Sequence, residues 1–264
     1  MLIDSHSHLN FREHFADLNV VRQDMDDNGV EAAIVVGIDL ISSARAIDIA
    51  NEWMFPTVGI HPQEDNFKDN DAEWKSLEKL LDNPKVVAVG ETGLDYFHGR
   101  VEMATQKKRF IRHMEYSVER ELPLIVHCRD RDGSREASAD TVDIIKKYGQ
   151  NSKGVLHCYA GDLELGQYAM DQGWAISMAG NITFKKAENL REAVRLLKGD
   201  HFLVETDCPF LTPHPYRGKK NSPGMVRHTA KILGEVKGWS FEETIQKTRR
   251  STIDLFRLKC QKKV

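Results

Sequence analysis

The sequence predicts a single (β/α)8 barrel, also called a TIM barrel, that spans residues 1–264. Short apolar runs of β type alternate with longer amphipathic segments, which is typical of a parallel sheet covered by helices. The length of 264 residues is close to the roughly 250 residues of such barrels. Polar residues also recur where the apolar runs end. A doubly wound open sheet is the competing fold, and it would leave its first and last strands far apart.

Eight runs are expected to be strands, and several are continuously apolar, as strands buried on both faces are. They cover residues 2–6, 32–37, 56–61, 86–91, 124–127, 154–157, 174–178 and 202–207. Between them, apolar residues recur at spacings of three and four, which predicts amphipathic helices. The clearest of these helices are residues 101–122, 134–148 and 186–197.

The composition excludes several classes of protein. The chain has 37 Lys and Arg against 40 Asp and Glu, so its net charge of −3 excludes a protein coated in positive charge. Four Cys without a Cys-x-x-Cys pair argue against a disulfide scaffold and a zinc ribbon. No signal-peptide pattern opens the sequence, and no apolar run approaches the roughly 20 residues that span a bilayer. We therefore expect a cytoplasmic monomer that does not contact membranes.

Chemically useful side chains lie at the carboxyl ends of the predicted strands, where TIM barrels build their active sites. They are His6, His8, His61, Glu91, His127, His157 and Asp207. His6 and Asp207 lie 201 positions apart, which makes seven steps of about 29 residues, the size of a β/α unit. Because a closed barrel places its eighth strand beside the first, His6, His8 and Asp207 can share one ion.

The residue types favour a metal centre over separate structural roles. His6 and His8 lie two apart on an extended strand and project to the same side. A lone Glu91 could equally cap a helix or form a salt bridge, and a single buried His127 or His157 could be a core residue. Imidazole and carboxylate together suit zinc, manganese and related ions.

The complete set predicts two divalent cations about 3.5–4 Å apart that share a water molecule. We assign His6, His8 and Asp207 to one ion and His127 and His157 to the other, with Glu91 between them. Asp207 can also act as a general base. Two acidic residues have alternative roles. Asp95 is expected either to support the site or to cap a loop. Glu205 is expected to form a structural ion pair or to orient a ligand.

At this point the chain resembles the TatD-type metal-dependent deoxyribonucleases, which are amidohydrolase-like barrels. The matching stretches are residues 4–9, 59–62, 90–96 (Gly-Glu-Thr-Gly-Leu-Asp-Tyr), 127–130, 154–159, 205–213 and 216–223. The resemblance covers nearly the whole chain and implies a TIM barrel, divalent metals and nuclease activity on DNA. It implies the same six ligands. Ser7 stands where the family often has Cys, and Asp254 where it favours Asn.

The resemblance predicts an enzyme that hydrolyses DNA, and possibly RNA, from a chain end, with single strands preferred. Arg129 and Arg217 are candidate phosphate contacts, Tyr96 is a candidate for base stacking, and His61 for phosphate binding or proton transfer. The ions could be zinc, magnesium, manganese or nickel. One alternative is an amidohydrolase acting on a small amide, ester or phosphotriester, and another is a barrel that only binds. A complete ligand set argues against the second.

Overall fold

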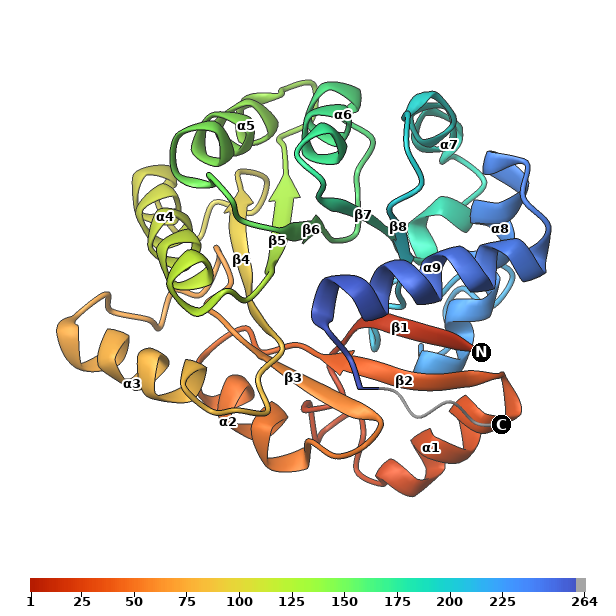
Figure 1. The fold of residues 1–264 in the computed structure, drawn as a ribbon, viewed down its shortest axis with the longest axis horizontal. Helices are drawn as coiled ribbons and strands as arrows, with labels where there is room; N and C mark the ends of the chain where they lie inside the picture. The colour runs from red at the N-terminus through yellow and green to blue at the C-terminus, as the bar shows by residue number, and fades with distance from the viewer. Residues whose placement is uncertain (260–264) are drawn as a thin grey trace.

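The computed structural model describes residues 1–259 and contains the predicted barrel (Figure 1). Eight parallel strands follow one another around the sheet in the order β1 to β8. They are β1 (Leu2–Ser7), β2 (Val30–Val35), β3 (Met54–Val58), β4 (Ala88–Asp95), β5 (Leu124–Arg129), β6 (Gly154–Leu156), β7 (Ala175–Met178) and β8 (Phe202–Val204). A single bridge between Ser7 and Cys208 brings the last strand back to the first, so the barrel is nearly closed.

Helices follow the strands and form the outer ring. They are α1 (Leu18–Asp27), α2 (Leu40–Ile49), α3 (Asp71–Leu81), α4 (Met103–Arg120), α5 (Glu136–Tyr148), α6 (Leu163–Asp171), α7 (Glu188–Leu196), α8 (Val226–Lys237) and α9 (Phe241–Phe256). Two 3-10 turns, η1 (Gly180–Thr183) and η2 (Pro223–Met225), lie in the loops after β7 and β8. The three helices that the sequence predicts most clearly are α4, α5 and α7.

Two strand boundaries differ from the prediction in ways that affect the site. The strand predicted to stop at Glu91 continues as β4 to Asp95, because it keeps pairing with β5 as far as Arg129. The strand predicted to end at Asp207 stops at Val204, so Asp207 lies in the loop after β8. Its backbone has a positive φ of 54°, which is incompatible with an extended strand.

The barrel interior is apolar at one end. Nine buried residues from the strands and their ends pack together there, and we call them the apolar plug. They are Ile3, Ala32, Ile34, Val36, Ala88, Ile125, Val155, Ala175 and Leu203. Phe256 and Leu258 at the end of α9 pack onto it. Figure 1 shows α9 lying across this end of the barrel. The plug closes the amino-terminal ends of the strands, so a cavity can open only at their carboxyl ends.

Side chains hold the seam where β8 meets β1. The backbone N–H and the hydroxyl of Thr206 donate to the buried carboxylate of Asp4, at 2.9 and 2.6 Å. The hydroxyl of Ser5 donates to the carbonyl of Val204 at 3.0 Å. These bonds replace a regular ladder and keep residues 6–8 beside residues 207–208.

The described residues include no helix that is long and apolar enough to cross a membrane.

Candidate metal centre

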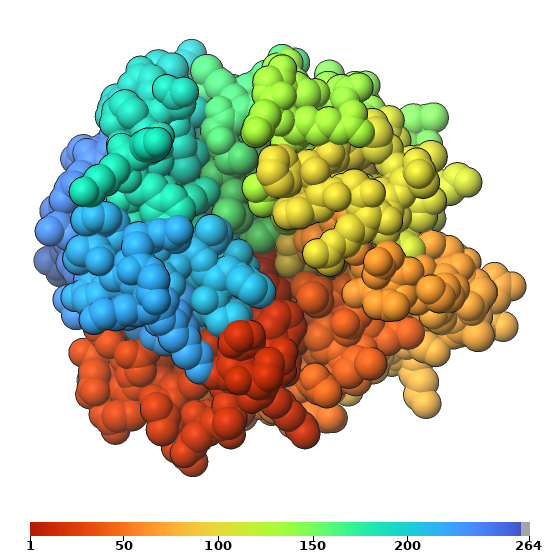
Figure 2. Space-filling model, turned by 180° about the vertical axis from the view of Figure 1, so that it is seen from behind, coloured from red at the N-terminus to blue at the C-terminus, as the bar shows by residue number. Residues whose placement is uncertain are grey.

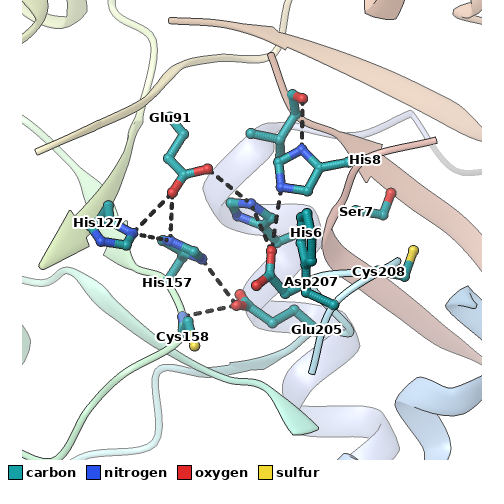
Figure 3. Close-up of polar contacts among 12 residues, drawn as sticks. His6, Ser7, His8, Glu91, His127, His157, Cys158, Glu205, Asp207 and Cys208 are labelled. Atoms are coloured by element: carbon teal, nitrogen blue, oxygen red, sulfur yellow. Dashed lines mark hydrogen bonds and ion pairs between the residues drawn. The ribbon is translucent and has the colours of Figure 1, made fainter. Parts of the chain in front are cut away.

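The structure brings the side chains selected from the sequence together at the carboxyl ends of the strands (Figure 3). His6 lies in β1, Glu91 in β4 and His127 in β5. His8, His61, His157 and Asp207 lie in the loops that follow β1, β3, β6 and β8. Seven residues from six strands thus meet in one place, as expected of a closed barrel but not of an open sheet.

Two of these side chains reach the interior because their strands each contain an extra residue. In β1, Asp4 pairs with Ala33 and Ser7 pairs with Val35, so three steps on β1 face two steps on β2. In β4, Val89 pairs with Leu124 and Thr92 pairs with Val126, so three steps on β4 again face two steps on β5. Such bulges shift the alternation of side chains.

The effect of the bulges is visible in which residues share the interior. Ile3 and Ala88 belong to the apolar plug, and His6 and Glu91 follow them by three residues. Regular alternation would turn a residue three positions away to the opposite face. The bulges therefore let each strand contribute an apolar residue to the plug and a polar residue to the centre.

Two positions of β4 near Glu91 require glycine, because β4 lies so close to β5. A Cβ atom on Gly93 would lie 2.0 Å from the carbonyl oxygen of His127, and the φ of Gly93 is +130°. Gly90 has φ +137°, and its Cβ would lie 2.6 Å from the carbonyl oxygen of Ile125. Gly93 lies inside β4 and not in a turn. Its role is to permit close approach of two strands.

Glu91 is the centre of the cluster. One oxygen, Oε1, lies 2.9 Å from Nε2 of His157 and 3.1 Å from Nδ1 of His127. Those two nitrogens are 3.2 Å apart. Ligand atoms about 2.1 Å from a zinc ion at tetrahedral angles lie about 3.4 Å apart. The three atoms are therefore spaced like the ligands of one ion.

A second group of donors meets the other oxygen of Glu91. Oε2 lies 3.3 Å from Nε2 of His6, and that nitrogen is 3.7 Å from Oδ1 of Asp207. The same Asp207 oxygen lies 3.3 Å from Nε2 of His8. His6, His8 and Asp207 form one of the donor groups whose ligand atoms all lie within 4.8 Å of one another. Glu91 thus has one oxygen for each group.

His6 fits a cation better than it fits any protein partner. Its side chain is completely buried, and neither ring nitrogen has a hydrogen-bond partner among the described residues. Leaving a buried polar nitrogen unpaired costs about 1–3 kcal/mol. A metal ion at this position would satisfy the nitrogen, so the donor set fits a divalent cation.

Two further carboxylates hold the histidines in place. Oδ2 of Asp95 lies 3.1 Å from Nε2 of His127 and 2.7 Å from Nδ1 of His98. Oε1 of Glu205 lies 3.2 Å from Nδ1 of His157 and accepts the backbone N–H of Cys158 at 2.8 Å. Each pairing fixes one ring nitrogen and leaves the other facing Glu91, as carboxylates near metal-binding histidines do.

These contacts answer the question that the sequence left open for Asp95 and Glu205. Asp95 both supports His127 and accepts the backbone N–H groups of Phe97 and His98, each at 3.0 Å. Glu205 faces His157 and forms no ion pair with an Arg in the described part of the chain. Its second oxygen has no hydrogen-bond partner there.

The carboxylates of the centre are ionised. Burial alone would raise the pKa of Glu91, but the positive charge of His157 and a hydrogen bond from His127 hold it well below its usual range. Burial also opposes the shift of Asp207, whose pKa is lowered by its hydrogen bond with His8. Burial lowers the pKa of His61 to about 3, so its imidazole is neutral. Ionised carboxylates and neutral imidazole are the forms that bind metals.

His61 lies closer to the centre than the sequence assignment implies. Its Nε2 is 3.5 Å from Oε1 of Glu91, while Nδ1 accepts the backbone N–H of Gln63 at 3.1 Å. His61, Glu91 and His127 form a further group of donors. Our sequence analysis gave His61 no metal, but the geometry allows it to be a ligand.

The site opens into a cavity of about 770 Å³. Figure 2 shows this face, with a hollow between the red and light-blue segments on one side and the yellow segment on the other. Besides the donors, its walls include Phe11, His98, Arg100, Arg129, Asn181 and Phe210. A cavity of this size can admit a nucleotide or a small molecule.

The three proposed substrate contacts differ in position. Arg129 lines the cavity, with its guanidinium 4.1 Å from the centre of the Phe97 ring. Arg217 is exposed in the loop after β8 and packs on Phe184, away from the cavity walls. Tyr96 is only 2% exposed, and its hydroxyl donates to Asp140 at 2.7 Å. Base stacking by Tyr96 was therefore a wrong prediction, because packing against α5 buries the ring.

The sequence analysis missed Phe11 and Phe210, the two phenylalanines of the cavity wall. Each follows a proposed ligand by three residues, His8 and Asp207 respectively. This spacing was a usable signal, since a residue just beyond a strand end lies at the rim of the barrel.

Comparison with known proteins agrees with this geometry. Residues 3–257 match the protein-family model described as TatD related DNase. A Bacillus subtilis protein named uncharacterized metal-dependent hydrolase YabD is 36% identical over 262 residues, which cover 98% of this chain and all of the relative. The Escherichia coli protein of the same description, YcfH, is 36% identical, with 97% of this chain and 96% of the relative covered.

A solved structure extends the likeness to three dimensions. The Escherichia coli TatD homologue YJJV superposes with a TM-score of 0.88 at 25% identity, over 97% of this chain and 98% of the other. The match covers nearly every strand and helix described above. The chain therefore belongs to the TatD-related DNase family of metal-dependent hydrolases.

Proposed function

We propose that the protein is a deoxyribonuclease that uses two divalent metal ions and removes nucleotides from the ends of single-stranded DNA. The observation that carries the proposal is the arrangement of two donor groups around Glu91. Oε1 faces His127 and His157, and Oε2 faces His6, with His8 and Asp207 beside it. The family description supports DNA as the substrate.

The residues divide into two sets of ligands. His6, His8 and Asp207 would hold one ion, and His127 and His157 the other, with Glu91 between them. Zinc, magnesium, manganese and nickel are all candidates, because mixed imidazole and carboxylate ligands accept several ions. Bound ions would neutralise the negative charge that develops on the phosphate and acidify a water molecule.

The protein itself provides proton transfer and substrate positioning. Asp207 is ionised, and its side chain retains 15% exposure where it borders the cavity, so it can accept a proton from water. His61 is neutral and partly exposed to the same cavity, where it can bind a phosphate oxygen or exchange a proton. Arg129 provides local positive charge, which a chain with a net charge of −3 needs for binding phosphate.

The test uses metal-free protein that is reloaded separately with each of the four ions. Defined single- and double-stranded oligonucleotides of DNA and RNA are then digested and resolved to single nucleotides. We expect single-stranded DNA to shorten stepwise from one end, and a chelator to stop the reaction. Hydrolysis that continues after exhaustive chelation would contradict the metal mechanism.

A second panel of substrates addresses the amidohydrolase alternative. Many related hydrolases bridge their metals with a carboxylated lysine, and Glu91 stands in that place in β4, which weakens this alternative. Rapid turnover of a lactone, an amide or a phosphotriester by protein that leaves single-stranded DNA intact would reverse the proposal.

A further inference from the structure

Two phenylalanines form an apolar wall beside the metal centre. The Phe11 ring stacks on the His8 ring, with 4.8 Å between centroids and 12° between planes. Phe210 meets Phe11 edge to face at 6.4 Å and His8 at 6.0 Å. Both phenylalanines line the cavity. We call Phe11 and Phe210 the aromatic wall.

The aromatic wall is not explained by packing alone. Phe210 is 50% exposed, although His8 across the seam is buried. Single exposed apolar residues are common on protein surfaces. Phe210 differs from them because it lines the cavity of the metal centre and contacts His8, whose Nε2 lies 3.3 Å from Asp207. A group bound on Phe210 would therefore lie next to the reacting phosphate.

The opposite side of the cavity is cationic. Arg100 follows β4 and Arg129 ends β5, while His98 on the same side pairs with the carboxylate of Asp95. In an eight-stranded ring, β4 and β5 lie opposite the seam between β8 and β1, which carries the aromatic wall. Figure 2 agrees, since the yellow segment faces the red and light-blue segments across the hollow. The metal centre lies between an aromatic side and a cationic side.

We propose that the aromatic wall is a nucleobase-binding subsite, in which the base next to the cleaved phosphate stacks on Phe210. The inference rests on the proposed nuclease function and adds an orientation to it. The base lies toward the β8–β1 seam, and the remaining phosphates pass Arg129 and Arg100. Stacking on an aromatic ring accepts every base, because each base has a flat face.

The experiment compares two single-stranded oligonucleotides that differ only in the terminal nucleotide at the end that is degraded. One carries adenine there, and the other carries an abasic tetrahydrofuran residue. Stacking changes binding by about tenfold per base, so kcat/KM of the unaltered enzyme should be about tenfold higher on the adenine substrate. Phe210→Leu should bring the ratio of the two rates close to one, with the larger loss on the adenine substrate.

Two further variants make the test specific. Phe210→Trp keeps an aromatic face and should retain the preference for adenine. Phe97→Leu is the matched control, because Phe97 is 45% exposed and packs on Arg129 at the cationic side. Its substitution should change both rates by the same factor and leave their ratio near ten.

Each other outcome overturns the inference in a recognisable way. A preference for adenine that survives in Phe210→Leu would place the base elsewhere. Equal losses on both substrates would mean that Phe210 acts only on the structure of the site. An enzyme that cuts DNA without any preference for the base would contradict the subsite alone. An enzyme that cuts neither substrate would contradict the nuclease function itself.

Discussion

The two ends of the barrel interior are built from different side chains. At the amino-terminal end, the apolar plug is completely buried and sealed by α9. At the carboxyl end, the same strands and their loops present five histidines and two carboxylates, and the ring nitrogens of the buried His6 have no hydrogen bond within the described residues. The plug stabilises the fold, whereas the polar end stores unfavourable contacts that a bound ion would relieve. Substitutions at the two ends should therefore separate activity from stability.

The largest effect is expected for Glu91→Gln at the polar end. The amide keeps the shape but loses the charge between the two donor groups, so activity should fall by at least about 1,000-fold. The metal-free variant should still fold but with a lower melting temperature, because the carboxylate that pairs with His127 and His157 is lost. Glu64→Gln is the control, since Glu64 lines the cavity but belongs to neither donor group, and should keep activity within a few-fold. Comparable loss in both variants would weaken the role given to Glu91.

The apolar plug should show the opposite behaviour. Leu203→Ala removes a fully buried side chain from the plug and should lower the free energy of unfolding by about 3 kcal/mol. Activity per folded molecule should stay near that of the unaltered protein. Leu196→Ala is the matched control, because Leu196 on α7 is 54% exposed, and should cost less than about 0.5 kcal/mol. Urea unfolding of both variants gives the comparison, and equal losses would refute it.

The pH dependence of the metal-free protein reports on the polar end. Burial alone would lower the pKa values of His8, His127 and His157, but neighbouring carboxylates raise them. Protonation of these three stabilises the fold below about pH 6.5, and the stabilisation is lost as pH rises through their folded pKa values. Burial lowers the pKa values of His6 and His61. The unfolded chain therefore takes up protons on these two residues more readily, and the fold loses stability as pH falls below about 6.5.

Together these shifts place the maximum stability of the metal-free protein near pH 6.5, with a loss of stability toward pH 8.5. Metal-loaded protein should not lose stability over that range, because ions bind the deprotonated ligands more tightly as pH rises. Thermal unfolding at pH 5.5, 6.5 and 8.5, with a chelator or with manganese, measures both curves. Metal-free protein that is most stable at pH 8.5 would contradict the shifts.

The smallest effect is expected outside both regions, at Tyr96. Tyr96→Phe removes the hydrogen bond to Asp140, which still pairs with Lys107 at 2.6 Å. The free energy of unfolding should fall by about 1 kcal/mol, and KM for single-stranded DNA should not change. A raised KM without a loss of stability would return Tyr96 to the substrate site.

The comparison also shows what the sequence could predict. The positions of the donors could be predicted from apolar runs that end in His or Glu. The parallel strands of a barrel present their carboxyl ends on one face, so these residues should meet there. The fold and the meeting of seven side chains could be predicted on this basis. The pairing of β8 with β1 followed from closure, and it brought Asp207 to His6 and His8.

Two features depended on tertiary structure. The bulges in β1 and β4 arise from pairing with neighbouring strands, and no local pattern revealed the extra residue. The exposure of an aromatic side chain in a loop depends on what packs over it. The sequence therefore did not show that Tyr96 is buried and Phe210 exposed. Arg217 lies in a loop on the catalytic side, but its contact with Phe184 takes it away from the cavity.

The seam between β8 and β1 has a consequence for folding order. Contacts such as Thr206 with Asp4 join residues 202 positions apart, so the ends of the barrel meet only after a long loop has closed. A chain that has emerged only as far as β7 would carry His6, His8, Glu91, His127 and His157 but not Asp207. The complete set of donors can exist only once the eighth strand has joined the first. An incomplete chain therefore lacks the complete donor set, and the metal centre of the hydrolase arises together with the finished fold.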